Sequence, residues 1–194
     1  MEAVEHKPGV ITIEPFFIPA ECQLFIDKSE ELGFEEATVS TTHGAVMMKG
    51  LRNNDRLIFN SFEVANDLWP RLRPFIDRVG IPYGRPKSIN ERFRVYRYGS
   101  DQRFKRHLDG SVEVRGLKSF ITFMVYLNDD FEGGATKFQE FRHQDGERIV
   151  DEISIQPKAG KTLLFQHDLW HEGEYVLSGQ KYVLRSDIFF EDWE

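Results

Sequence analysis

The sequence predicts an α+β fold in which two amphipathic helices precede a double-sheet jelly roll. Helical periodicity is confined to the first half of the chain, and after Pro86 about eight short strand-like segments follow, separated by Gly, Pro and Asp. With 194 residues, 40% apolar and 29% charged, the chain has a globular composition and can bury a core. No repeat or linker divides it, so we expect one domain over residues 1–194.

The first half begins with a strand and a helix. Val10 to Glu14 alternates apolar and polar residues, as a strand with one buried face does. Pro19 then opens an amphipathic helix that ends at Gly33. Its expected apolar stripe consists of Cys22, Phe25, Ile26 and Leu32.

Residues 61–75 are expected to form the second helix. Ser61 can cap its N-terminus, because a serine side chain accepts a hydrogen bond from the first free backbone amides. The apolar face consists of Val64, Ala65, Leu68, Trp69 and Leu72. Pro70 lies inside this pattern and is expected to kink the helix or to break it.

The second half of the chain has the pattern of strands and turns. The strongly apolar segment 119–128 and the alternating segment 91–99 are the clearest of these strands. The remaining strands are expected at 135–141, 148–156, 161–166, 174–177 and 180–190.

Charge and cysteine content exclude several classes of protein. The net charge of −7 argues against nucleic acid or anionic lipid as a partner, because phosphate binding needs a concentrated basic face. The single cysteine, Cys22, allows no internal disulfide. The N-terminus has no apolar signal segment, and no apolar run reaches membrane-spanning length, so we expect a soluble, cytoplasmic protein.

A histidine, a carboxylate and a distant second histidine suggest a metal site. His107 and Asp109 are separated by one residue, so on an extended segment both point to one side while Leu108 points into the core. His171 would arrive from a strand remote in sequence. Two imidazoles and one carboxylate form the facial triad of non-haem iron(II) oxygenases and leave coordination positions open, although zinc or manganese would fit on affinity alone.

The identity of the second imidazole is ambiguous, because the chain has six histidines and His167 lies only four residues before His171. We favour His171, since Glu172-Gly173 follows it and a short loop links it to the strand ending at Phe165. His167 would then lie at the surface or behind the ligands.

Residues 90–190 resemble the prolyl 4-hydroxylase-like branch of the 2-oxoglutarate- and iron(II)-dependent oxygenases. The resemblance comes from the order of several short strings, each weak alone. The strings are Asn90 to Gly99, Phe104 to Gly110, Thr122 to Asn128, Gly133 to Phe138, Pro157 to Gly160, His171 to Gly173 and Gly179 to Tyr182. Residues 1–89 match more loosely, as the helical support of such a domain.

The resemblance implies a double-stranded β-helix core, with iron(II) held by His107, Asp109 and His171. It also implies 2-oxoglutarate as co-substrate, O2, and L-ascorbate to keep the iron reduced. A basic residue after the distal histidine pairs with the far carboxylate of 2-oxoglutarate in this family, and Lys181 stands at that position. Arg185 shares the same strand face and remains the alternative, because an arginine would bind a carboxylate in a bidentate way.

The resemblance further assigns Tyr98 and Tyr126 to the co-substrate pocket, where both rings can line the wall and both hydroxyls can bind the co-substrate. Either tyrosine could instead be an ordinary barrel aromatic. Thr122 and Met124 share the strand face of Tyr126. Gly133, Gly134 and Thr136 have the composition of a turn.

The implied reaction is hydroxylation of an unactivated carbon, with release of succinate and CO2. The expected substrate is a prolyl or other amino-acid residue of a peptide or protein; the alternatives are a free amino acid or small metabolite, and a non-catalytic metal-binding barrel. The polar segment 52–56 is either a loop at the barrel mouth, where Asn54 or Arg56 contacts substrate, or a solvated turn. Four basic residues crowd the approach to His107 in the sequence: Arg97, Arg103, Lys105 and Arg106. They either favour an acidic substrate or face outward from the strand.

Overall fold

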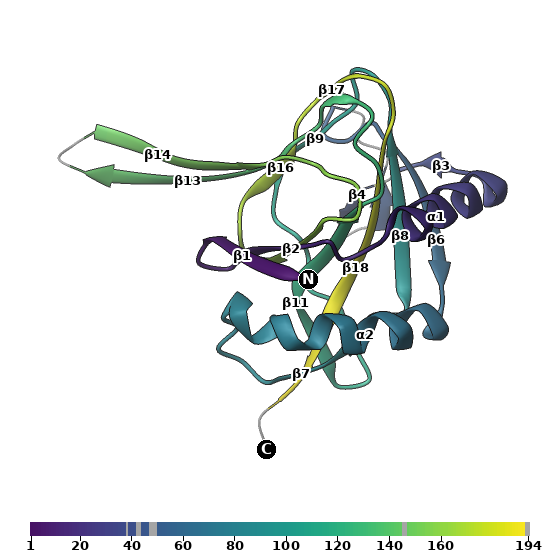
Figure 1. The fold of residues 1–194 in the computed structure, drawn as a ribbon. Helices are drawn as coiled ribbons and strands as arrows, with labels where there is room; N and C mark the ends of the chain where they lie inside the picture. Colours follow the sequence, from purple (N-terminus) through teal and green to yellow (C-terminus); the bar gives the residue numbers. More distant parts are fainter. Residues whose placement is uncertain (38, 42–43, 47–49, 145–146, 193–194) are drawn as a thin grey trace.

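The computed structural model describes residues 1–37, 39–41, 44–46, 50–144 and 147–192. Two helices cover one face of a large, mostly antiparallel sheet, and a smaller sheet lies on the other side of the barrel (Figure 1). This arrangement confirms the predicted α+β class with a jelly-roll core. Within the described residues, no helix is both long and apolar enough to cross a bilayer.

The helices are α1 (Pro19–Leu32) and α2 (Phe62–Ile76), and a 3₁₀ turn (Asp77–Val79) follows α2. The strands of the first half are β1 (Glu2–Lys7), β2 (Val10–Glu14), β3 (Glu35–Glu36), β4 (Val39–Thr41), β5 (Gly44–Val46), β6 (Asp55–Asn60) and β7 (Arg85–Ile89). The next strands are β8 (Arg92–Tyr98), β9 (Phe104–His107), β10 (Glu113–Val114), β11 (Leu117–Tyr126), β12 (Glu132–Gly133) and β13 (Thr136–Gln144). The last are β14 (Glu147–Ile155), β15 (Thr162–Gln166), β16 (His171–Gly173), β17 (Val176–Ser178) and β18 (Lys181–Glu191).

The large sheet has ten strands, with the main order β1-β2-β15-β11-β18-β8-β6-β3. Strands β7 and β10 pair with β18 and β11 outside this path. The smaller sheet has the order β14-β13-β16-β9, and its β13–β14 hairpin projects from the body of the molecule (Figure 1). Since β18 lies between β11 and β8, the end of the chain closes the centre of the large sheet.

The central strands of the large sheet are buried on both faces. One face packs on the helices, and Phe93 and Val95 of β8 belong to that core. The other face packs toward the small sheet, and Tyr96 and Tyr98 of the same strand belong to the second core.

Both predicted helices form, with two differences in detail. Ser61 accepts a hydrogen bond from the Val64 amide at 3.2 Å, as expected of an N-cap. Pro70 does not break α2, because it lies on the exposed face of the helix. Proline has no amide hydrogen, so one backbone carbonyl of the preceding turn loses its helical hydrogen bond, and at this exposed face water can bind that carbonyl. In α1, Cys22 is buried, whereas Leu32 is 66% exposed and does not belong to the packed stripe.

Residues 1–89 provide more than the expected helical support. The strands β1, β2, β6 and β7 of this segment all join the large sheet. The charged N-terminus, for which no strand was predicted, pairs as β1 with β2.

Candidate metal centre and its cavity

The two histidines of the predicted triad meet because their strands are neighbours. His107 ends β9, His171 begins β16, and the two residues are direct partners in the antiparallel register. Asp109 lies just beyond the end of β9, and its amide donates to the His167 carbonyl at 3.2 Å. Leu108 is 42% exposed, so the prediction that it points into the core is wrong. The reason is that the strand ends at His107.

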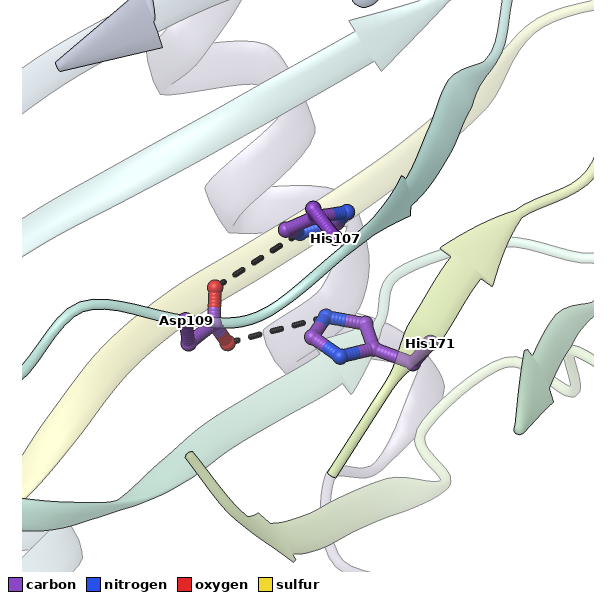
Figure 2. A group of neighbouring side chains, drawn as sticks. All are labelled: His107, Asp109 and His171. Carbon is purple, nitrogen blue, oxygen red and sulfur yellow. Dashed lines mark ion pairs between the residues drawn. The ribbon is translucent and has the colours of Figure 1, made fainter. Parts of the chain in front are cut away.

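The three side chains converge on one point (Figure 2). His107 Nε2 lies 3.6 Å from Asp109 Oδ1, and His171 Nε2 lies 3.7 Å from Asp109 Oδ2. One ligand atom from each residue lies within 4.8 Å of the others. Each imidazole donates its Nδ1–H to a backbone carbonyl, His107 to Lys105 at 2.8 Å and His171 to Leu169 at 2.9 Å. This leaves both Nε2 lone pairs aimed at a common position, as a divalent metal requires.

The protonation states also suit metal binding. Burial lowers the pKa of His171 to about 4, although the Asp109 charge acts in the opposite direction, so the imidazole is neutral at pH 7. Burial alone would raise the pKa of Asp109, but the charges of Arg185 and His171 hold it well below its usual range. A neutral imidazole and an ionised carboxylate are the forms that coordinate a metal.

Arg185 is bound to carboxylates of the protein itself. Its Nη2 lies 3.0 Å from Asp109 Oδ2 and 3.2 Å from Asp187 Oδ1. The Thr122 hydroxyl also donates to Asp109 Oδ2, at 2.5 Å. Arg185 and Thr122 therefore hold one oxygen of the Asp109 carboxylate and orient the other.

Lys181, by contrast, is a buried cation with no carboxylate within ion-pair distance among the described residues. It is 3% exposed, and its Nζ donates to the Gly134 carbonyl at 2.6 Å. The ammonium lies 5.3 Å from the ring centroid of Tyr98 and 5.5 Å from that of Tyr126. Burial lowers its pKa to about 7, and the distant charge of Glu174 only partly opposes this. Such a group is stabilised by an anion that enters the cavity.

Tyr98, Thr122 and Met124 line one cavity with the three candidate ligands, whereas Tyr126 is not among the residues that line it. Lys181, Val183 and Arg185 all face it, as the alternation of β18 predicts. Burial raises the pKa of Tyr98 to about 12 and also raises that of Tyr126, whose hydroxyl donates to Thr136 Oγ1 at 2.7 Å. Thr136 is therefore a wall residue at the start of β13, and its interpretation as a turn residue is wrong.

His167 is not part of the triad. Its buried ring lies behind Arg185, with Nε2 3.5 Å from Asp187 Oδ1. The neighbouring basic residues also turn away from the cavity. Arg97 pairs with Asp55 and Glu30, and the guanidiniums of Arg103 and Arg106 lie over aromatic rings elsewhere. The expectation that this group guides an acidic substrate to His107 is not supported.

The segment 52–56 lies at the barrel mouth and is not a solvated turn. Arg52 pairs as an isolated bridge with Phe104 of β9, and its guanidinium lies over the rings of Tyr96 and Phe104. Tyr96 could have been expected at this wall from the strand pattern, since it shares a strand face with Tyr98. No local pattern indicated Arg52, because its position depends on a pairing between segments about fifty residues apart.

Comparison with known proteins agrees with the geometry. The model of the 2OG-Fe(II) oxygenase superfamily matches residues 93–186, which include all three candidate ligands. The chain is therefore similar to this superfamily over the region that carries the candidate site. The oxygenase is 28% identical to prolyl 4-hydroxylase 1 of Arabidopsis thaliana, over 93% of this chain and 69% of the relative.

Two solved structures share the fold of the oxygenase over 95% of its length. One is a viral collagen prolyl hydroxylase from Paramecium Bursaria Chlorella virus-1, solved as a 2OG complex, with a TM-score of 0.63, 21% identity and 97% of that chain covered. The other is a prolyl hydroxylase from Trichoplax adhaerens in complex with a hypoxia inducible factor peptide fragment, with a TM-score of 0.65, 17% identity and 84% of that chain covered. The oxygenase is thus a prolyl 4-hydroxylase-like enzyme that uses Fe(2+), 2-oxoglutarate and O2.

Proposed function

We propose that the oxygenase hydroxylates an unactivated carbon of a prolyl or other amino-acid residue in a peptide or protein, with iron held by His107, Asp109 and His171. The observation that carries the proposal is the convergence of two oriented Nε2 lone pairs and one ionised carboxylate. When bound, iron and 2-oxoglutarate supply the oxidising chemistry, in which one atom of O2 enters the substrate C–H bond and the other enters succinate as CO2 leaves.

The residues of this chain bind, orient and shield. Lys181 pairs with the far carboxylate of 2-oxoglutarate in this proposal, because no carboxylate in the described part of the chain binds this buried cation, whereas Arg185 already binds two. The rings of Tyr98 and Tyr126 flank that ammonium and exclude water from it. Arg185 and Thr122 orient Asp109.

A peptide or protein substrate is supported by the relatives. The Arabidopsis and viral proteins are named as prolyl hydroxylases, and the Trichoplax enzyme was solved with a peptide. A free amino acid or small metabolite remains the rival substrate, and turnover with each kind of substrate separates the two.

The proposal is tested by adding iron(II), ascorbate and 2-oxoglutarate to the protein and measuring succinate with and without proline-containing peptides. We expect peptide to stimulate succinate release and to gain the mass of one oxygen atom on proline or another residue. Stimulation by free proline alone would favour the small-metabolite alternative. If no candidate is oxidised and 2-oxoglutarate is not consumed, the proposed activity is wrong.

The buried ammonium of Lys181 predicts a pH dependence of folding in the absence of 2-oxoglutarate. Because its folded pKa is lowered from 10.5 to about 7, the unfolded chain binds more protons between these two values. Lys181 therefore makes the free energy of unfolding increase with pH from about 7 to about 10.5. We expect Lys181→Met to remove this component of the pH dependence, as measured by urea unfolding at several pH values. If the pH dependence is the same in the variant, the conclusion that burial lowers the pKa of Lys181 is wrong.

A further inference from the structure

A second, larger hollow opens beside the metal-site cavity and is lined by four arginines. This cleft of about 400 Å³ reaches His107 and Asp109, so a molecule lying in it would place its atoms next to the candidate metal ligands. Its guanidiniums come from segments far apart in sequence: Arg52, Arg56, Arg94 and Arg185. Because the whole chain has a net charge of −7, this basic cleft is a local feature of the fold.

Three of these four arginines form ion pairs within the protein. Arg185 binds Asp109 and Asp187, Arg94 binds Asp187 at 3.1 Å, and Arg56 binds Glu35 at 3.2 Å. Arg52 has no ion pair among the described residues. It is only 5% exposed, and its Nη2 is buried without a hydrogen-bond partner. Burying a guanidinium without an anion destabilises the folded protein, and an anionic ligand that pairs with the guanidinium removes this cost.

The guanidinium of Arg52 is held in a fixed orientation. Its Nε donates to Asn54 Oδ1 at 2.6 Å, and Asn54 is itself buried and donates to the Asp55 carbonyl. The charged carbon lies 4.2 Å from the ring centroid of Tyr96 and 4.5 Å from that of Phe104. A planar cation held against two rings and hydrogen-bonded to Asn54 is preorganised for a carboxylate.

The distance from Arg52 to the metal site fits a substrate group close to the reacting carbon. Phe104, on which Arg52 stacks, is itself stacked on His107 with a centroid separation of 3.5 Å. One aromatic ring thus separates the guanidinium from a candidate ligand. Together the two stacked separations span at most about 8 Å, the length of about two residues at roughly 3.8 Å between neighbouring Cα atoms.

The electrostatic state of Tyr96 supports a positive cleft. Burial alone would raise the pKa of this tyrosine, but the charges of Arg52, Arg185 and Arg94 lower it to about 8. Three guanidiniums therefore act on the same wall, and the nearby carboxylates do not cancel them there.

We propose that this cleft selects substrates with a carboxylate within about two residues of the carbon to be hydroxylated, and that Arg52 binds this carboxylate. The inference rests on the proposed hydroxylase function and names its substrate class. The carboxylate can belong to an acidic side chain beside the target residue or to the free α-carboxylate of the target itself. Both sources present the same anion to Arg52.

Four peptide probes of equal length, each with a blocked N-terminus, separate the side-chain carboxylate from the α-carboxylate. All but the free-carboxylate probe end in an amide. The first pair carries aspartate or asparagine directly before proline, and the second pair ends in proline with a free carboxylate or an amide. We expect one carboxylate probe to have an apparent KM about 10- to 100-fold below that of its amide counterpart, the effect of one charge-assisted hydrogen bond. Arg52→Gln should remove this difference without raising the KM of the amide probes. Peptide binding to the iron-free protein, measured by fluorescence anisotropy, should show the same pattern.

Two variants serve as controls for fold and charge. Asn54→Asp keeps an acceptor for Arg52 Nε but adds a competing carboxylate, so it should also weaken selection even if Arg52→Gln fails to fold. Arg103→Gln removes a guanidinium that lies over Tyr175 outside the cleft and should leave selection unchanged. Equal KM values for carboxylate and amide probes in the unmodified protein would overturn the inference while leaving the hydroxylase function intact. The absence of turnover with every probe, together with no 2-oxoglutarate consumption, would instead count against the hydroxylase function.

Discussion

Replacing His107 or Asp109 by alanine is expected to lower 2-oxoglutarate turnover by at least about 10³-fold, because an iron ligand contributes several kcal/mol to the reaction. The structure gives each residue a ligand atom that nothing else in the site replaces. His107 Nδ1 is engaged by a carbonyl and only Nε2 faces the centre. Asp109 is the only carboxylate in the described cluster. Succinate release under saturating 2-oxoglutarate measures the loss.

The fold should survive both changes. His107 lies at the end of a short strand, and Arg185 keeps Asp187 as a partner when Asp109 is removed. Equilibrium dialysis against iron(II) without oxygen should show lost metal binding, while the circular dichroism spectrum and Tm stay close to those of the unmodified protein.

Three further histidine variants make this experiment decisive. His6→Ala is the matched control, since this ring bonds to Thr12 on the N-terminal hairpin and should leave turnover unchanged. His171→Ala should abolish iron binding, whereas His167→Ala should not, because His167 lies behind the Arg185–Asp187 pair. Persistent turnover in His107→Ala or Asp109→Ala would reject the ligand assignment. Loss of iron binding only in His167→Ala would show that the distal histidine was chosen wrongly.

The candidate metal residues were predictable because chemistry restricts them strongly. Few residue types bind a divalent metal, and the spacing of His107, Asp109 and His171 left one main ambiguity, which strand register resolves by pairing His171 with His107. The face shared by Lys181 and Arg185 was predictable for a similar reason, since side chains alternate along a strand. Which of the two cations lacks a protein carboxylate was not predictable, because Asp109 and Asp187 reach Arg185 through folding.

The elements that the sequence missed are those stabilised by distant partners. Strands β1, β6 and β7 have mixed polar composition, and each forms because a neighbour offers an open edge. The same limit applies to Arg52, whose place beside the metal site follows from its pairing with Phe104.

Lys181→Met is expected to raise the apparent KM for 2-oxoglutarate by about 10²- to 10³-fold, since removing one partner of a buried ion pair costs about 3–5 kcal/mol. Methionine fills a similar volume, so the walls formed by Tyr98 and Tyr126 should remain in place. Iron binding should be unaffected, because Lys181 contacts none of the candidate ligands. Succinate release as a function of 2-oxoglutarate concentration gives the KM, and the maximal rate should change much less.

Arg185→Met provides the contrast that decides between the two cations. This change removes the 3.0 Å contact with Asp109 and leaves Asp187 with Arg94, so we expect weaker iron binding and a lower maximal rate at all 2-oxoglutarate concentrations. A pure increase in the KM for 2-oxoglutarate in Arg185→Met, with no such increase in Lys181→Met, would assign the far carboxylate to Arg185. Stability gives an independent check, because the ligand-free Lys181→Met protein should be at least as stable as the unmodified one at pH 7. A large loss of stability in Lys181→Met would mean that the ammonium stabilises the fold through a partner within the protein. Lys181 would then not be a free cation available to bind 2-oxoglutarate.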